Sequence, residues 1–553
     1  MGSTEEVTTP SWQTKTKQYR DHQAAKIPPE WRLDPSLTTD LGPTSTRSVL
    51  SIPASCGILT PDEVEITENY DATALLEKLA HNKFTSVAVT MAFCKRAAIA
   101  QQLTNCLTET FFDRALKRAQ ECDDYLAAND KAMGPLHGLP ISLKDSFHVK
   151  DIPSTIGYVS FLDHPPATSD AALVQVLLSL GAVLYVKTNI PQSLMTADSD
   201  NHVFGRTLNP HKLSLGAGGS SGGEGALLAM RGSVLGVGTD IAGSIRIPAY
   251  VNGTFGLRPM AARVPYGGQA SPARAGSFGI APCAGPLARS VRDVQLFMES
   301  VLGFDCWGVD PSVISAPWRA VEVEKTKKLR IGYLLEDPEY PAHPPVLRAL
   351  KTAITNLESA GHTLIPLAPD LPSPTLLSEA MESAFTHFAM DPAKTSLHHI
   401  TASGEPLVAS IPTASMPELK HFQPSVDDVF RLNVERAGYQ TLFRDLWVKH
   451  GLDVLVMPMY QATAVPHDRY GLPVYTVIAN LLDYPAMTMP YLKAEKSADA
   501  DYRRDVSYTP PYVPDEVEGA PCGLQILGRP MRDEELVRHC QILADALEIK
   551  PLS

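Results

Sequence analysis

The chain reads Gly218-Gly219-Ser220-Ser221-Gly222-Gly223 and then, after a short apolar interval, Gly238-Thr239-Asp240-Ile241-Ala242-Gly243-Ser244. About one-third of residues 216–243 are glycine, far above the rate for the whole chain. Glycine accepts backbone angles that other residues avoid and allows close approach of chain segments, so this density predicts loops of unusual geometry. A flexible linker would lack the apolar helix and strand expected at 224–230 and 234–237. The segment therefore predicts an ordered loop–helix–strand–loop unit.

Short apolar strands and helical patterns alternate on both sides of this unit. We expect strands at 139–143, 182–186, 234–237, 329–334, 362–367, 454–457 and 523–527. We expect helices at 171–180, 224–230, 346–359 and 534–547. This alternation predicts the α/β class, with a sheet that has helices on both faces.

The sequence divides into three predicted parts. Residues 1–58 form a polar, proline-punctuated extension that we expect to wrap over a neighbouring surface. Residues 59–130 are a predicted helical subdomain packed on the core, and it starts with the capping pattern Thr60-Pro61-Asp62-Glu63. Residues 131–553 are the predicted catalytic α/β core, within which residues 370–427 show no regular period.

Composition and charge exclude several classes of protein. The 553 residues are 44% hydrophobic and 20% charged, as in globular proteins. A net charge of −13, without any stripe of Lys and Arg, argues against a nucleic-acid partner. The longest apolar stretch, 171–186, is interrupted by polar residues and is too short to cross a membrane. Residues 1–20 lack the apolar core of a secretory signal, so we expect a cytoplasmic protein without membrane association.

The eight cysteines are scattered without a C-x-x-C pair, which argues against a zinc site, a redox site and a disulfide framework. We expect most of them to be small buried apolar residues. The chain contains no Gly-Lys dipeptide, so a P-loop is absent, and no clean G-x-G-x-x-G follows a strand. We therefore predict neither a metal nor a cofactor. The sequence leaves a homodimer open.

A lysine at the end of an apolar run completes a reactive set with the two serine loops. Lys144 follows Leu139-Pro140-Ile141-Ser142-Leu143, and a dry pocket would lower the pKa of its amine and allow the neutral form. Asp145 should point to the opposite side if the strand persists. Ser244 would attack a carbonyl carbon, Ser220 would relay the proton and Lys144 would act as the base. This set predicts acyl transfer without a histidine.

A second arrangement of the same segment stays open. Gly219-Ser220-Ser221-Gly222-Gly223 matches the G-x-S-x-G nucleophile elbow with Ser221 at its centre, as in an esterase of the α/β-hydrolase type. His467 or His539 would then complete the triad. The elbow requires a good strand directly before it, and residues 209–216 make a poor strand.

Lys144, Gly218–Gly225 and Gly238–Arg246 together resemble the signature of the amidase signature family, and residues 93–105 resemble its fungal acetamidase-type members. The likeness covers residues from about 58 to 548. It implies a large mixed twisted sheet flanked by helices, with an N-terminal helical region. It also implies hydrolysis of carboxylic amides to a carboxylate and ammonia or an amine.

The resemblance implies a Ser-Ser-Lys triad of Lys144, Ser220 and Ser244, with a cis peptide bond before Ser220 and an acyl-enzyme on Ser244. The oxyanion donors would be N–H groups of the second loop, from Ile241, Ala242, Gly243 and Ser244. Ala242 stands where many members have glycine, so this donor loop would be disturbed only if Ala242 required a positive φ.

The same resemblance places the acyl pocket at a segment that follows Asn189-Ile190-Pro191-Gln192, namely Leu194, Met195 and Thr196. Tyr460 and Gln461 would help to close that pocket. Asp240 and Arg246 flank the nucleophile, and we expect them to brace its loop. The histidines near the motifs, His137, His148 and His202, are expected in packing or surface roles.

The expected substrates are small aliphatic or aryl carboxamides, handled by the chain alone. One alternative is the amidase subunit of a tRNA-dependent amidotransferase, which shares the signature. The acidic charge and the lack of a basic patch argue against it. A scaffold that has kept the fold without activity would have no need of the full triad.

Overall fold

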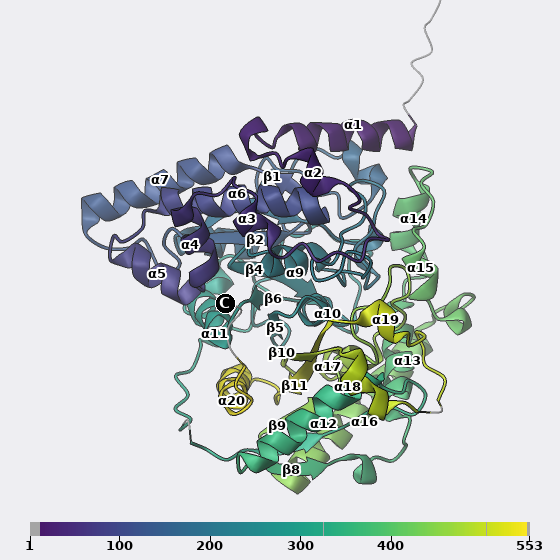
Figure 1. Cartoon of the computed structure of the whole chain (residues 1–553). Coiled ribbons are helices and arrows are strands. Elements are labelled where there is room, and N and C mark those ends of the chain that lie inside the picture. The colour runs from purple at the N-terminus through teal and green to yellow at the C-terminus, as the bar shows by residue number, and fades with distance from the viewer. Residues whose placement is uncertain (1–10, 325, 505, 550–553) are drawn as a thin grey trace, which may run out of the picture.

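A single mixed sheet of eleven strands forms the centre of the molecule (Figure 1). The computed structural model describes residues 11–324, 326–504 and 506–549. Residues 1–10, which belong to the predicted N-terminal extension, lie outside the described residues. The strands are β1 (Leu107–Thr110), β2 (Pro140–Lys144), β3 (Val183–Thr188), β4 (Leu235–Asp240), β5 (Phe255–Arg258), β6 (Cys283–Ala288), β7 (Arg330–Tyr333), β8 (Thr363–Pro366), β9 (Val454–Met457), β10 (Ala486–Lys493) and β11 (Pro521–Leu527).

The strand order across the sheet is β1-β3-β2-β4-β6-β5-β10-β11-β9-β7-β8. The pairs β2–β3, β2–β4, β7–β8 and β7–β9 are parallel, and the other neighbours are antiparallel. The parallel strands β2 and β4 pair at Ser142–Gly236 and Leu143–Val237. Because their carboxyl ends meet at one edge of the sheet, the residues that follow these two strands lie next to each other.

Helices surround this sheet. In the N-terminal half they are α1 (Trp12–Ala25), α2 (Pro35–Thr38), α3 (Ile52–Ser55), α4 (Pro61–Asn69), α5 (Ala72–Ala80), α6 (Ser86–Thr104), α7 (Phe112–Asn129), α8 (Ala172–Ser179), α9 (Gly222–Ala229) and α10 (Arg246–Val251). The later ones are α11 (Val291–Leu302), α12 (Pro344–Ser359), α13 (Leu376–Phe388), α14 (Thr395–Thr401), α15 (Ser410–Thr413), α16 (Val426–His450), α17 (Val474–Leu482), α18 (Lys496–Asp499), α19 (Pro514–Val517) and α20 (Asp533–Ala546). In Figure 1, α6 and α7 lie toward one end of the molecule and α12 and α16 toward the other. The predicted α/β class with a large mixed sheet is confirmed.

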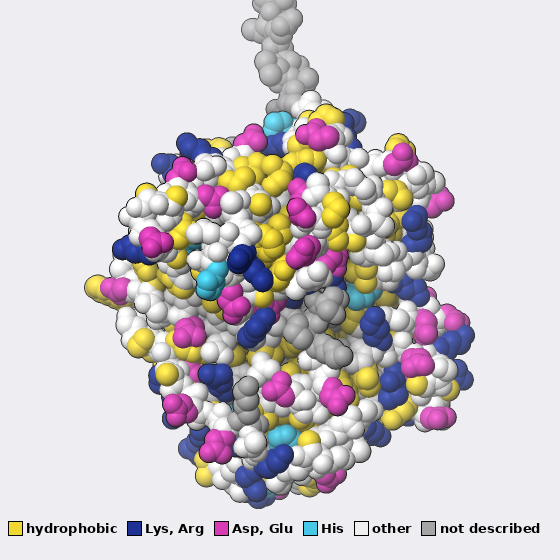
Figure 2. All heavy atoms as spheres, turned by 60° about the vertical axis from the view of Figure 1, so that its left-hand side comes forward, with side chains coloured by type: hydrophobic (Ala, Val, Ile, Leu, Met, Phe, Trp, Pro, Cys, Tyr) yellow, Lys and Arg dark blue, Asp and Glu magenta, His cyan; other side chains and the backbone are white. Residues whose placement is uncertain are grey.

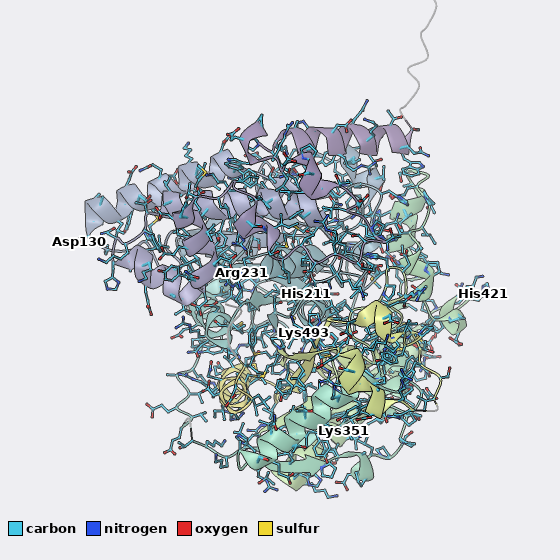
Figure 3. All side chains as sticks on the ribbon, viewed as in Figure 1. Asp130, His211, Arg231, Lys351, His421 and Lys493 are labelled. Atoms are coloured by element: carbon cyan, nitrogen blue, oxygen red, sulfur yellow. The ribbon has the colours of Figure 1, made fainter. Side chains whose placement is uncertain are left out.

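The helical region before the core begins as its sequence predicts. Thr60 accepts a hydrogen bond from the Glu63 N–H, and the Glu63 carboxylate accepts one from the Thr60 N–H, so the capping box of α4 is complete. Helix α7 ends at Asp130, which has a left-handed backbone and lies at the outer tip of the helix (Figure 3). Strand β1 also belongs to this region, yet it pairs with β3 in the central sheet. Residues 59–130 therefore contribute a strand to the sheet as well as helices.

Helix α1 of the N-terminal extension is attached to the sheet through one buried carboxylate. Glu109 on β1 accepts hydrogen bonds from Gln23 at 2.9 Å and from Tyr19, and it pairs with Lys26 at 3.1 Å. Burial, together with the neighbouring Glu109, raises the pKa of the Tyr19 hydroxyl well above its usual range. The described part of the extension thus lies on the core, as a wrapping segment would.

The structure also contains elements that the sequence patterns did not indicate. Residues 370–427, which have no regular apolar period, include the helix α13 and the shorter α14 and α15. Strand β10 carries Pro490 and was not expected, although it lies in the middle of the sheet order. Helix α16 exposes Val426, Phe430 and Val434 in its first half, whereas Phe443, Leu446 and Trp447 in its second half are buried.

Burial and surface charge agree with a globular chain. Seven cysteines are buried, Cys56 is partly buried, and all eight are free. On the face shown in Figure 2, Lys and Arg side chains are interspersed with Asp and Glu and form no continuous basic stripe. Within the residues that the structure describes, no helix combines the length and the apolar character needed to span a bilayer.

Candidate active site

Lys144 is the last residue of β2, and its side chain is completely buried. Its Nζ donates hydrogen bonds to Ser220 Oγ at 2.8 Å and to Thr239 Oγ1 at 2.7 Å. No carboxylate pairs with it in the described part of the chain. Burial lowers the pKa of the amine to about 7, against the opposing influence of Asp240 and Glu224. The lysine is therefore held dry, among hydroxyl groups, with a substantial neutral fraction near neutral pH.

Asp145 follows Lys144 directly but belongs to a different set of contacts. Its carboxylate accepts hydrogen bonds from Thr108 Oγ1 and from the Ile156 N–H, both at 2.8 Å. It also lies 3.5 Å from the buried Lys187 amine. As expected from the alternation along a strand, Asp145 turns away from Lys144 and leaves that lysine without a counterion.

Ser220 is placed by a tight glycine turn between the sheet and α9. The Gly219–Ser220 peptide bond is cis, as the resemblance implied, and Gly218 has a φ of 77°. A side chain at Gly219 would not fit, because its Cβ would lie 2.5 Å from the Thr196 carbonyl oxygen and 2.9 Å from Ala197 Cα. The close packing of this turn holds the Ser220 hydroxyl against Lys144.

Ser244 lies on the loop between β4 and α10, and the residue is 9% exposed. The Ser221 N–H donates to the Ser244 carbonyl oxygen at 3.2 Å, which joins the two serine loops. Gly243 has a φ of 124°, in the region that favours glycine, whereas Ala242 is not among the described residues with positive φ. Alanine is therefore compatible with the backbone at position 242.

The Asp240 carboxylate braces this loop from the end of β4. It accepts hydrogen bonds from the Gly243 N–H at 2.8 Å and the Ile245 N–H at 3.1 Å, and it pairs with Arg246 at 3.0 Å. Burial alone would raise the pKa of Asp240, but the Arg246 guanidinium holds it well below its usual range. The predicted bracing role of Asp240 and Arg246 agrees with these contacts.

One predicted oxyanion donor has a different partner in the structure. The Gly243 N–H donates to the Asp240 carboxylate at 2.8 Å. The N–H groups of Ile241, Ala242 and Ser244 have no hydrogen bond to any described residue. These three amides therefore remain candidates for the predicted oxyanion donors.

Helix α17 supports the Ser244 loop from far along the chain. Thr476 Oγ1 donates to the Ala242 carbonyl oxygen at 2.7 Å, and Asn480 Nδ2 donates to Asp240 Oδ1 at 3.0 Å. Arg246 donates to Asn480 Oδ1 at 2.6 Å and to Gln525 on β11. Sequence reasoning missed these residues; the available signal was the pair of polar residues four positions apart in the otherwise apolar stretch 474–482.

The predicted pocket residues occupy a strained turn beside Gly219. Ser193 and Leu194 have φ values of 70° and 60°, and Leu194 packs in an apolar cluster with Tyr158 and Val408. Thr196 is buried, while Met195 is 45% exposed. The segment thus approaches the Ser220 turn, and its contact with the acyl group stays a prediction.

Tyr460 and Gln461 are buried in a neighbouring cluster. Tyr460 stacks on Tyr470 with the ring centroids 3.9 Å apart, and Gln461 donates to the Thr509 carbonyl oxygen at 3.0 Å. These contacts give both residues packing roles. Their part in closing a substrate pocket stays a prediction.

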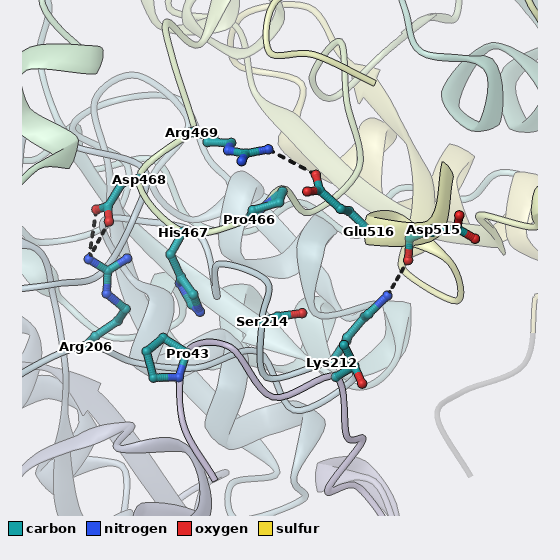
Figure 4. A pocket seen from close by; sticks show the side chains of 11 residues that line it. Pro43, Arg206, Lys212, Ser214, Pro466, His467, Asp468, Arg469, Asp515 and Glu516 are labelled. Carbon is teal, nitrogen blue, oxygen red and sulfur yellow. Dashed lines mark hydrogen bonds and ion pairs between the residues drawn. The ribbon is translucent and has the colours of Figure 1, made fainter. Parts of the chain in front are cut away.

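The histidines of the alternative elbow lie in other surroundings. His467 Nε2 donates to the Leu213 carbonyl oxygen at 2.9 Å, and the residue lines a hollow of about 520 Å³ near the Arg206–Asp468 ion pair (Figure 4). His539 lies in α20, where burial lowers its pKa to about 4. Ser221 Oγ lies 3.4 Å from the Thr239 backbone nitrogen, and no histidine contacts it in the described residues. Within the described residues, Ser221 therefore lacks the histidine contact that the elbow arrangement requires.

Comparisons with known proteins agree with this fold. The model of the Amidase family matches residues 88–537. An amidase from Gibberella moniliformis is 40% identical over 97% of this chain and 99% of its own length. An acetamidase from Emericella nidulans is 38% identical, covering 95% of this chain and 96% of that protein. The solved structure of a fatty acid amide hydrolase has a TM-score of 0.90 and 32% identity, covering 98% of this chain and 96% of that one.

The fold and these relatives define an enzyme that hydrolyses amide bonds. The chain belongs to the amidase signature family, and its relatives include fungal acetamidases and amidases across nearly the full length.

The glycine at position 243 provides a direct test of the loop geometry. In Gly243→Ala, the new Cβ would lie 2.7 Å from Thr476 Cβ on a backbone that L-residues rarely adopt. We expect kcat/KM for a simple amide to fall by at least about 100-fold, because small displacements of reacting groups cost about that much. Ala242→Gly is the matched control and should retain activity within about threefold, because its φ is not in that region. Wild-type activity in folded Gly243→Ala would contradict the arrangement described.

Proposed function

We propose that this enzyme hydrolyses small aliphatic or aryl carboxamides through a Ser-Ser-Lys triad of Lys144, Ser220 and Ser244, with an acyl-enzyme on Ser244. The observation that most supports the proposal is the 2.8 Å contact between Lys144 Nζ and Ser220 Oγ, in a site where the lysine has no counterion among the described residues. A neutral amine can accept the proton of a neighbouring hydroxyl group, whereas an ammonium group in an ion pair cannot accept a proton.

Acylation begins with proton transfer along the triad. Lys144 accepts the proton of Ser220, Ser220 accepts that of Ser244, and Ser244 Oγ forms a bond to the amide carbonyl carbon. The carbonyl oxygen becomes an oxyanion, which the N–H groups of Ile241, Ala242 and Ser244 stabilise. The C–N bond then breaks as Ser220 donates a proton to the nitrogen and regains one from the Lys144 ammonium. Ammonia or an amine leaves.

Deacylation uses the same groups with water as the nucleophile. Ser220 accepts a proton from the attacking water and passes its own to Lys144, and the hydroxide oxygen adds to the ester carbon. When the C–O bond to Ser244 breaks, Ser244 Oγ takes up the proton that returns through Ser220. The carboxylic acid leaves and the resting state is restored.

The assignment of Ser244 is tested by covalent labelling. A fluorophosphonate probe followed by peptide mapping should give an adduct on Ser244, and Ser244→Ala should lower kcat/KM by at least about 10⁴-fold, because removing the nucleophile of a triad has effects of that size. Ser221→Ala is the matched control, since this serine has no role in the proposed relay. An adduct on Ser221, or loss of activity in Ser221→Ala alone, would point to the esterase arrangement instead.

The lysine base gives a defined pH dependence. Protonation of Lys144 removes the base, and the pKa of its amine is about 7, so kcat/KM should fall below neutral pH. With a single controlling proton, kcat/KM at pH 5 should be about 100-fold below the plateau. Lys144→Ala should lower the plateau strongly and abolish this acid limb. A profile that is flat between pH 5 and 8 would exclude Lys144 as the base.

The substrate class is supported by the acetamidase relatives and is tested with a panel of amides. The purified chain alone should hydrolyse acetamide or benzamide with kcat/KM at least about tenfold above that for a long-chain fatty amide, because the match to the acetamidases covers nearly the whole chain. A preference for the long chain would overturn the small-substrate proposal. Activity that requires added partner chains would instead favour the amidotransferase subunit.

A further inference from the structure

A buried carboxyl group lies close to the lysine and has no part in the relay. Glu224 is the third residue of α9, the helix that starts directly after the Ser220 turn, and its side chain is fully buried. Its Oε2 is 2.6 Å from Ser142 Oγ, and its Oε1 is 2.8 Å from Thr188 Oγ1. Ser142 precedes Lys144 by two residues on β2, and Thr188 is opposite Lys144 in the β2–β3 register. The carboxyl group therefore connects α9 to both strands beneath the lysine.

The hydrogen bonds around Ser142 show how many protons this cluster needs. Ser142 Oγ lies 2.6 Å from Glu224 Oε2 and 2.8 Å from Ser233 Oγ, and Ser233 Oγ lies 3.0 Å from the Leu235 carbonyl oxygen. A carbonyl oxygen only accepts, so Ser233 donates to Leu235 and Ser142 donates to Ser233. Ser142 then has no hydrogen left for Glu224. All three contacts are hydrogen bonds only when Glu224 itself carries a proton and donates it to Ser142.

The cations on the elements around Glu224 are paired with other carboxylates, with Lys144 as the exception. Within residues 11–324, 326–504 and 506–549, Glu224 makes no ion pair. The titratable or charged groups on the elements packed against α9 are Lys144 on β2, Tyr185 and Lys187 on β3, Cys94, Lys95 and Arg96 on α6, Asp240 at the end of β4, Cys283 on β6, and Arg246 and Tyr250 on α10; Cys106 lies just before β1. Apart from Lys144, each cation in this set has a carboxylate partner elsewhere: Lys95 pairs with Glu63, Arg96 with Glu68, Lys187 with Asp145 and Arg246 with Asp240.

The balance of forces at Glu224 favours the neutral acid. Burial raises the pKa of the carboxyl group to about 8, although Ser142, Thr188 and Lys144 act in the opposite direction. Its place in the first turn of α9 also favours a carboxylate, but this interaction with the helix end is weaker than the cost of burying an unpaired charge.

We propose that Glu224 is a positioning residue for Lys144 and that it acts as a protonated carboxylic acid, donating to Ser142 and accepting from Thr188. This inference rests on the proposed role of Lys144 as the base. As a neutral acid, Glu224 holds α9, β2 and β3 together and places no negative charge beside the amine. An ionised Glu224 would stabilise the ammonium form of Lys144 and so reduce the neutral fraction that the reaction needs.

The first test replaces the acid by its neutral isostere. In Glu224→Gln, the amide NH2 can donate to Ser142 and the amide oxygen can accept from Thr188, as in the proposed acid. We expect kcat/KM to stay within about threefold of wild type, and the midpoint of the acid limb to stay within about 0.3 pH unit, because no charge has been removed. A downward shift of that midpoint by about one unit or more would show that Glu224 is ionised in the wild type and would overturn the proposal. Loss of activity in a folded Glu224→Gln would overturn it as well.

The second test removes the hydrogen bonds and keeps the bulk. Glu224→Met should lower kcat by at least about tenfold, because the free energy of one lost hydrogen bond corresponds to about a tenfold change. KM should stay unchanged, because the substrate does not touch Glu224. Wild-type kcat in this variant would show that Glu224 positions nothing. If Glu224→Met does not fold, Glu224→Gln still decides the question.

A spectroscopic measurement reports the proton directly. The infrared difference spectrum of wild type minus Glu224→Gln should contain the carbonyl stretch of a protonated carboxylic acid at pH 6, and the band should disappear with a midpoint near pH 8. Absence of the band at pH 6 would overturn the proposal. Labelling of Ser244 and the Lys144→Ala profile are measured on the same preparations. If these two fail, the triad is wrong; if they hold while the Glu224 results fail, only the present inference is wrong.

Discussion

The site depends on burying an amine without giving it a counterion. The carboxylates near Lys144 are engaged elsewhere: Asp145 faces Lys187, and Asp240 pairs with Arg246. The partners of the Lys144 nitrogen are the hydroxyl groups of Ser220 and Thr239. A hydroxyl group can donate or accept a hydrogen bond, and it is uncharged, so it does not hold the lysine in its ammonium form. Since a buried charge is costly unless it is paired, this arrangement favours the neutral amine. The two ion pairs thus neutralise these carboxylates locally, so that they do not pair with Lys144.

The position of the reactive groups follows from the topology of the sheet. Because β2 and β4 are parallel neighbours, their carboxyl ends place Lys144 and Asp240 at one edge. The chain leaves β4 directly into the Ser244 loop, and the Ser220 turn leads into α9, which packs on the same strands. Buried polar groups hold the Ser220 turn and the Ser244 loop in place. Each hydrogen bond described for these two loops joins a donor to an acceptor. Such satisfied networks rigidify a site, whereas partly satisfied ones would destabilise it.

Local patterns in the sequence were sufficient for some parts of the structure and insufficient for others. The capping box at Thr60, the strand that ends at Lys144 and the helix after Ser220 have clear local signals, and each is present. Strand β10 was missed because Pro490 interrupts its pattern. Helix α17 was missed because it is a short apolar run in which all nine residues are buried, so it has no exposed polar face. The contacts of Thr476, Asn480 and Gln525 with the Ser244 loop span more than 200 residues of sequence. No local pattern encodes such partners, and they depend on tertiary packing.

The same long-range bracing has a consequence during synthesis of the protein. When the ribosome has translated β2, β4 and the Ser244 loop, Arg246 still lacks Asn480 and Gln525, which come from α17 and β11. The buried guanidinium and the loop it supports can reach their final arrangement only after the last fifth of the polypeptide has emerged. A nascent chain or a fragment that ends before α17 therefore holds all three residues of the proposed triad without the framework that orients them.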